Sequence, residues 1–386
     1  MTAYLTHGMI MSFIYFQVVV LIIVLSNIVL LHRFRHRNTP MNYPFVSILV
    51  PARDEGKRIS ICIRSLLEQD YPNYEVIVLN DQSRDNTADI LERIRVEYPR
   101  LKVLVGTSPP EGFTGKNWAC MQLAQHAQGE LIMFTDADTI FQPQALKEVV
   151  RAMLGEQADL ITGYPRQLME SWGERLLVPF FLWAVLCFVP LWLAYRLRIP
   201  SLSSAVGQMM LFRREAYQKV GGHANLGAVI VEDLALARSI KRAGLRWRVV
   251  NITDLISCRM YLGGQEAFDG FAKNLFATFE FRLIEFLFVY LWLGALFLEP
   301  LIILAAKLFG LAPSASYTEL AICIGLSVLV WCIPYRELRL PIALGLIYPI
   351  TMIANEGAAF QSLILSLTGR LSWKGRPIPQ PKWKWL

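Results

Sequence analysis

The sequence is poor in charged residues. Asp, Glu, Lys and Arg make up only 18% of its 386 residues, whereas hydrophobic residues make up 54%. An ordinary soluble domain contains about 25% charged residues, so this composition excludes a typical soluble enzyme. The net charge is +7, but many of the Lys and Arg residues flank apolar segments instead of forming a nucleic-acid-binding stripe. That placement fits anionic lipid head groups and predicts a membrane, not a nucleic acid, as the partner.

Paired cysteines are also absent. The six cysteines are scattered, without a Cys-x-x-Cys motif: Cys62, Cys120, Cys187, Cys258, Cys323 and Cys332. This spacing excludes a zinc site and a disulfide framework. It is typical of buried thiols in a reducing compartment.

A long apolar run lies near the start of the chain. Residues 9–31 are almost uninterrupted in their apolar character, and a helix of this length crosses a hydrocarbon core of about 30 Å. A basic cluster at residues 32–37 follows at once, so we place the chain from residue 32 onward in the cytosol. The run is too long for a signal-peptide core and lacks a small-residue cleavage site, which predicts a retained anchor.

The last third of the chain is apolar again. We expect residues 284–309 and 318–334 to span the membrane, joined by a short external loop. Residues 340–367 are apolar but contain two prolines, an asparagine and a glutamate. One more crossing would leave the basic tail outside, whereas the Trp/Lys alternation of residues 381–386 is typical of a cytosolic tail on the interface. Residues 340–367 are therefore predicted to fold back or to split.

Between these regions, short apolar runs alternate with helical patterns. The predicted strands are residues 46–51, 75–79, 102–105, 131–135 and 160–162, and the helical patterns include 58–68 and 85–97. Unbroken Val- and Ile-rich strands that alternate with helices indicate an α/β fold with a mainly parallel sheet. In such sheets, ligands bind at the carboxyl ends of the strands.

Residues 176–195 form another apolar stretch, which is interrupted by Pro179 and Pro190. A simple crossing here would put Asp233 on the opposite side of the membrane from the acidic pair near residue 136. We therefore favour an interfacial or re-entrant helix pair, with Trp183 and Trp192 near head-group level. A true transmembrane helix is the alternative.

Two carboxylates, Asp136 and Asp138, directly follow a predicted buried strand. Separated by one residue, they can approach one divalent cation, and Mg²⁺ or Mn²⁺ readily completes its shell with diphosphate oxygens. Such a metal neutralises a departing nucleoside diphosphate. Strand-end Asp pairs also form turns and caps, so the pair alone leaves both interpretations open.

Three further polar positions lie at strand ends or helix starts. Asp81 is placed to accept the N–H of a pyrimidine base, although capping of the helix that opens near Asp85 is an alternative. Lys116 precedes a helical stretch from Ala119 and is a candidate diphosphate contact, or else a solvated surface lysine. Asp233 begins another helical run and is either a helix-dipole partner or a general base.

Five segments of the chain, taken in order, resemble the motifs of a known protein family. The segments are VSILVPARDE at residue 46, VLNDQSRDNT at 78, GKNWA at 115, TDAD at 135 and VEDLAL at 231. In this order they resemble the family 2 glycosyltransferases, from about residue 45 to residue 281. The resemblance implies a GT-A fold, a nucleotide-sugar donor and inversion at the anomeric carbon.

The same resemblance assigns roles to residues. It implies nucleoside contacts from Ala52, Glu55 and Asp81, and a diphosphate contact from Lys116. It further implies that Asp136 and Asp138 hold the sugar-nucleotide and the divalent metal, and that Asp233 is the base.

One motif of the processive synthases in that family is missing. A Gln-x-x-Arg-Trp sequence would stand some 35–40 residues after the base, where this chain reads GFAKNLF from residue 270. Its absence favours transfer of a single sugar. The membrane layout, the GKNW segment and the WKGR segment at residue 373 look like carotenoid glycosyltransferases of the diaponeurosporenoate and chlorobactene type, and are similar to hopanoid and ceramide glycosyltransferases.

The sequence thus predicts an inverting, non-processive hexosyltransferase in the cell membrane, with its catalytic domain in the cytoplasm. We expect it to move one hexose, from UDP-glucose, to a carotenoid or other polyisoprenoid lipid. Transfer to a polyprenyl phosphate, to a hopanoid or to a ceramide is an alternative, and a catalytically silent nucleotide-sugar-binding scaffold is another. The expected divisions are an anchor (1–37), a GT-A domain (38–283) with the insert 176–195, membrane helices (284–367) and a basic, aromatic tail (368–386).

Overall fold

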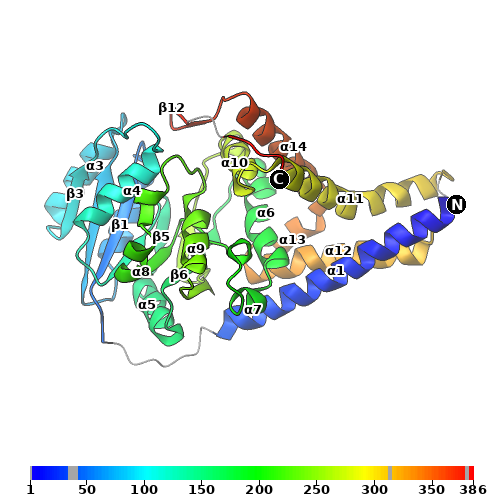
Figure 1. Cartoon of the computed structure of the whole chain (residues 1–386), viewed down its shortest axis with the longest axis horizontal. Coiled ribbons are helices and arrows are strands. Elements are labelled where there is room, and N and C mark those ends of the chain that lie inside the picture. Colours follow the sequence, from blue (N-terminus) through cyan, green and yellow to red (C-terminus); the bar gives the residue numbers. More distant parts are fainter. Residues whose placement is uncertain (1, 34–41, 312–314, 379–381) are drawn as a thin grey trace.

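The computed structural model describes residues 2–33, 42–311, 315–378 and 382–386. Most of the predicted basic cluster, residues 34–37, lies outside the described residues. An α/β domain forms one end of the molecule, and long helices extend from it to the opposite end, where the N-terminus lies (Figure 1).

A seven-stranded sheet forms the centre of the α/β domain. Its strands, in spatial order, are β3 (Leu101–Val105), β2 (Tyr74–Asn80), β1 (Val46–Ala52), β4 (Leu131–Phe134), β8 (Met210–Arg213), β6 (Leu160–Tyr164) and β9 (Trp247–Asn251). All neighbouring strands are parallel except β8, which runs antiparallel to β4 and β6. The predicted mainly parallel sheet is confirmed, and the antiparallel strand was not predicted.

A small sheet stands beside the large one. It consists of β5 (Thr139–Phe141), β10 (Ile256–Cys258) and β7 (Arg166–Gln167). Around both sheets lie the helices α2 (Ile59–Leu67), α3 (Thr87–Glu97), α4 (Gly115–His126), α5 (Ala145–Glu156), α8 (Arg214–Lys219) and α9 (Glu232–Arg242). Two 3₁₀ turns, Pro200–Leu202 and Gly222–Asn225, complete the domain.

The two faces of the large sheet pack into different cores. One face packs against α2, α3 and α5 in a core confined to the α/β domain. The other face packs against α4 and α9, and its core continues without a break into the long apolar helices. The α/β domain therefore shares a hydrophobic core with the membrane helices, which fixes the orientation of one relative to the other.

Four helices are long and apolar enough to cross a membrane. They are α1 (Thr2–Arg33), α11 (Leu283–Leu308), α12 (Tyr317–Glu337) and α14 (Tyr348–Leu367). A short helix, α13 (Ile342–Leu346), precedes α14, and the chain breaks between them at Ile347. The predicted split within residues 340–367 is therefore present.

The apolar stretch 176–195 forms α6 (Trp172–Phe188) and α7 (Leu191–Ala194). The indole of Trp183 is completely buried and stacks on Trp331 of α12, with ring centroids 4.0 Å apart. The indole of Trp183 therefore does not contact lipid head groups, because it is enclosed by protein and its ring nitrogen donates to the carbonyl of Val330 at 3.1 Å. Trp192 remains 44% exposed.

The C-terminal segment returns to the α/β domain. After α10 (Gly264–Thr278) and the apolar helices, the chain forms a hairpin of β11 (Ser372–Trp373) and β12 (Arg376–Pro377). Beyond the hairpin, Lys384 and Trp385 accept the first N–H groups of α11 through their backbone carbonyls, at 2.8 and 3.1 Å. The tail end thus caps a membrane helix.

Candidate active site

A cavity of about 510 Å³ opens at the carboxyl ends of β1, β2 and β4. The loop before β8 also reaches this edge, since an antiparallel strand begins where its parallel neighbours end. The wall of the cavity includes every site residue expected from the sequence: Ala52, Glu55, Asp81, Lys116, Asp136, Asp138 and Asp233. Helices α6 and α10 and the β11–β12 hairpin supply the remaining walls.

Asp136 and Asp138 lie in the turn between β4 and β5. The carboxylate of Asp136 forms an ion pair with Lys116 at 2.7 Å, while Oδ1 of Asp138 accepts a hydrogen bond from the thiol of Cys258 at 3.3 Å. Burial, and then repulsion from Asp136, raise the pKa of Asp138. No group of three or more His, Cys, Asp or Glu side chains within the described part of the chain could hold a metal by itself. A cation here would need ligands from a bound molecule as well.

Lys116 lies in the first turn of α4, two residues after the N-cap residue Thr114, whose hydroxyl accepts the N–H of Asn117 at 3.2 Å. The helix begins at Gly115, four residues earlier than expected. The ammonium of Lys116 is 2.7 Å from both Asp136 and Glu232, and these two acids hold its pKa well above the usual value despite its burial. Lys116 therefore connects the loop after β4 to the start of α9.

Asp233 stands in the first turn of α9. Its carboxylate accepts the N–H of Gly207 at 2.9 Å and its neighbour's N–H, that of Leu234, at 2.7 Å. Burial, together with repulsion from Glu232, raises the pKa of Asp233 to about 7. A carboxyl group with such a pKa exchanges protons near neutral pH, which suits a general base.

The carboxylates of Asp136 and Asp233 both lie close to Gly207. A methyl carbon added to it would stand 3.5 Å from an oxygen of Asp136 and 3.6 Å from an oxygen of Asp233, with the nitrogen of Lys116 also at 3.5 Å. The two carboxylates thus face one point in the same cavity. Sequence patterns did not single out Gly207, because its role comes from the close approach of three side chains that are distant along the chain.

The expected nucleoside end of the cavity is formed by the loops after β1 and β2. Asp81 is 2% exposed, and its N–H donates to the carbonyl of Ala52 at 2.8 Å. Burial raises the pKa of Asp81, although Arg376 opposes this shift. Asp81 does not cap α3, since Asp85 accepts the N–H of Thr87 instead, at 3.0 Å.

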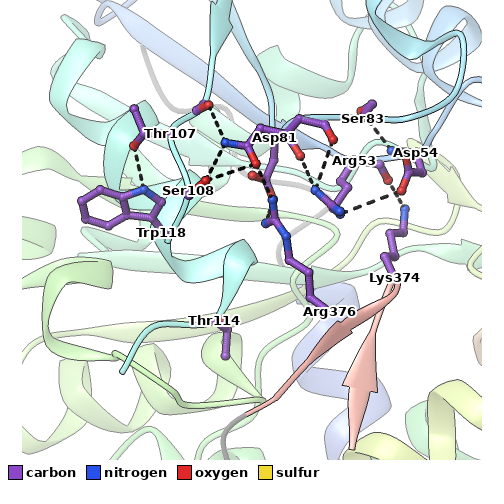
Figure 2. A network of polar contacts seen from close by, with 12 residues as sticks. Arg53, Asp54, Asp81, Ser83, Thr107, Ser108, Thr114, Trp118, Lys374 and Arg376 are labelled. Carbon is purple, nitrogen blue, oxygen red and sulfur yellow. Dashed lines mark hydrogen bonds and ion pairs between the residues drawn. The ribbon is translucent and has the colours of Figure 1, made fainter. Parts of the chain in front are cut away.

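Two cations at this end were not expected from the sequence. Arg376 donates to Asp81 at 2.7 Å (Figure 2). Lys374 forms an ion pair with Glu55. In the sequence, the WKGR segment stood out only for its likeness to carotenoid glycosyltransferases, which gave its two cations no role in the site. A third cation, Lys273 of α10, also lines the cavity, and burial lowers its pKa to about 8.

A mainly parallel sheet with acidic groups converging at the carboxyl ends of its strands is the architecture of a GT-A glycosyltransferase. The family model described as glycosyl transferase family 21 matches residues 12–334. The chain belongs to this family and is a glycosyltransferase, so the predicted GT-A fold and enzyme class are confirmed.

Two kinds of known protein are similar to this chain. The 4,4'-diaponeurosporenoate glycosyltransferases of Staphylococcus aureus strains USA300 and NCTC 8325 are 28% identical over 250 residues, or 63% of this chain. The match spans 64% of the length of these relatives. Among solved structures, a mannosyltransferase from Pyrobaculum calidifontis, in complex with GDP-Man and Mn²⁺, shares the fold at 20% identity, with a TM-score of 0.54 over 92% of this chain and 99% of that one.

Proposed function

We propose that this protein transfers one hexose from a nucleotide-sugar, UDP-glucose, to a carotenoid or other polyisoprenoid lipid, with inversion at the anomeric carbon. The observation that carries the proposal is the convergence of Asp136 and Asp233 around Gly207. A carboxylate that handles the leaving group and one that accepts a proton must be close together for in-line transfer.

In this proposal, Asp233 takes the proton of the acceptor oxygen. That oxygen forms a bond to the anomeric carbon while the bond from this carbon to the diphosphate breaks, and the diphosphate departs with the electron pair. The pKa of about 7 lets Asp233 be ionised before transfer and protonated after it. Ala52, Glu55 and Asp81 contact the nucleoside, and Lys116 contacts the diphosphate.

We also propose that Asp136 and Asp138 hold a divalent cation, Mg²⁺ or Mn²⁺. Burial raises the pKa of Asp138, and repulsion from Asp136 raises it further, and a bound cation would relieve this repulsion. A mannosyltransferase of the same fold was solved with Mn²⁺. When bound, the cation neutralises the charge that develops on the diphosphate.

The acceptor is proposed to be a lipid because part of the cavity wall is apolar and belongs to membrane-associated helices. Phe181 of α6 and Phe271 and Leu275 of α10 line the cavity. Both helices share a core with the membrane helices. The relatives from Staphylococcus aureus are named for transfer to diaponeurosporenoate, a carotenoid. We place the catalytic domain on the cytosolic side, where nucleotide-sugars are available.

Lipid analysis tests the proposal. Membranes from cells that express the protein are incubated with labelled UDP-glucose and a carotenoid acceptor, and the lipid extract is analysed by mass spectrometry. We expect a labelled lipid that is heavier than the acceptor by one hexose, and none from membranes without the protein. A long water-soluble polymer as the sole labelled product would contradict the proposal.

A further inference from the structure

The C-terminal hairpin closes one side of the cavity. Strands β11 and β12 are joined by Lys374 and Gly375, which have positive φ values of 44° and 74°. Two consecutive residues with positive φ form the tight turn that suits a two-residue hairpin. This turn directs Lys374 and Arg376 into the wall that also contains Lys116 and Asp136.

Both hairpin cations contact the expected nucleoside end of the site. Arg376 donates through Nη1 to Oδ2 of Asp81 at 2.7 Å and through Nη2 to Gln82 at 3.0 Å. Lys374 donates to the carbonyl of Arg53 at 2.5 Å (Figure 2) and also forms an ion pair with Glu55. The hairpin is therefore joined to the loops after β1 and β2 by charged hydrogen bonds.

The charge balance of the cavity makes these cations important. Eight acidic residues line it: Glu55, Asp81, Asp136, Asp138, Glu232, Asp233, Glu266 and Asp269. Six basic residues face them: Arg53, Arg58, Lys116, Lys273, Lys374 and Arg376. A nucleoside diphosphate is itself an anion and needs cationic groups that local carboxylates do not fully occupy. Lys116 is already held between two acids. Arg376 has five N–H donors, and the bonds to Asp81 and Gln82 use two of its nitrogens.

We propose that the hairpin Ser372–Pro377 is part of the donor site. Arg376 orients Asp81 toward the nucleoside and gives further N–H groups to the diphosphate, and Lys374 adds a second positive charge beside it. This inference rests on the proposed function and extends it to a segment that lies far from the acidic motifs along the chain. It also connects donor binding to the C-terminal helices, since α14 ends at Leu367, only a few residues before the hairpin.

Calorimetry with two probes tests the inference. UDP and uridine are titrated in the presence of Mn²⁺ into the full-length protein in detergent, for the wild type and for Arg376→Ala and Arg376→Gln. We expect both variants to bind UDP about tenfold more weakly or worse, because a charge-assisted contact to the diphosphate is lost. Uridine lacks the diphosphate, so its affinity should fall much less. The glutamine variant keeps a polar side chain beside Asp81 and covers the case in which alanine impairs folding.

Lys382→Ala is the matched control, because Lys382 is an exposed lysine of the same tail. It removes one positive charge from the tail and should leave both affinities unchanged. Equal losses for UDP and uridine in the Arg376 variants would show that Arg376 only supports Asp81, and a gain in UDP affinity would show that the hairpin blocks the site. Either result would overturn the inference about the hairpin and leave the proposed function standing. If the wild type binds neither probe, the proposed function fails as well.

Discussion

At the scale of single residues, the proposal depends most on Asp233. Its carboxylate is held by two backbone N–H groups and faces the same point as Asp136. We expect Asp233→Asn to lower kcat by about 100-fold or more, since a general base contributes on this order, and to leave UDP binding nearly unchanged. Product formation by mass spectrometry and UDP calorimetry measure the two effects.

The matched control is Asp89→Asn, which makes the same change on the exposed surface of α3 and should leave kcat unchanged. A lipid phosphate as acceptor needs no base. Wild-type turnover in Asp233→Asn would therefore favour the polyprenyl-phosphate alternative over the carotenoid proposal.

The pKa of Asp233 also predicts a pH dependence. Burial raises this pKa to about 7, and only the ionised carboxylate can accept a proton. We therefore expect kcat/KM to fall by about tenfold for each pH unit below about 7 and to level off above it. Initial rates between about pH 5 and pH 8 measure this. A flat acidic limb would mean that no group with this pKa takes part in the free enzyme.

Sequence patterns identified the acids and Lys116 but missed the two cations of the hairpin. Asp136, Asp138 and Asp233 could be found because each follows a local signal, either a strand end or a helix start. Arg376 could not, because its partner Asp81 lies 295 positions away along the chain. A contact of that kind depends on how the membrane helices return the chain to the α/β domain, and no local pattern contains this information.

At the scale of elements, α6 shows why apolar stretches are hard to interpret. Its sequence is apolar enough for an interfacial or a spanning helix, but only 17 residues are helical. A capping box starts it, with Ser171 and Glu174 each satisfying the other's backbone N–H. Trp183 and Phe180 are then buried against α12, which makes α6 a core element between the two parts of the molecule.

We expect Trp183→Ala to destabilise the protein by about 3 kcal/mol or more, because it removes a fully buried indole and its hydrogen bond to Val330. Thermal unfolding in detergent measures the loss as a lower melting temperature. Trp192→Ala is the control, since Trp192 is 44% exposed and should matter little. Equal melting temperatures for the two variants would contradict the described role of α6.

At the scale of the whole molecule, the described contacts limit how many helices can cross the membrane. His7 of α1 and Glu319 of α12 pair at 2.9 Å. The N-terminus, near which α1 begins, lies at the end far from the α/β domain (Figure 1). Near the domain, Glu337 at the other end of α12 accepts from Asn251 of β9 at 2.5 Å. Helices α1, α11 and α12 extend from the α/β domain to the opposite end of the molecule, where the N-terminus lies (Figure 1).

The contacts of the hairpin bear on whether the number of membrane crossings between the α/β domain and the hairpin is odd or even. The chain leaves the α/β domain before α11 and returns to it at Lys374 and Arg376, so it must cross an even number of times in between. We therefore expect α11 and α12 to supply two crossings and α14 to supply none. Instead, α14 packs beside α6 and α10, with Asn355 donating to the carbonyl of Leu176 at 3.0 Å. Length and apolarity alone would have counted α14 as a span.

Reporter fusions test this three-crossing topology. A fluorescent protein that matures only in the cytosol should be bright when fused after Leu386, because the tail and the catalytic domain lie on one side. Alkaline phosphatase, which is active only outside, should be active when inserted after Gly310, between α11 and α12, and inactive after Leu386. Phosphatase activity after Leu386 would mean that α14 crosses the membrane, and the hairpin could then not reach Asp81 from the same side as the catalytic domain.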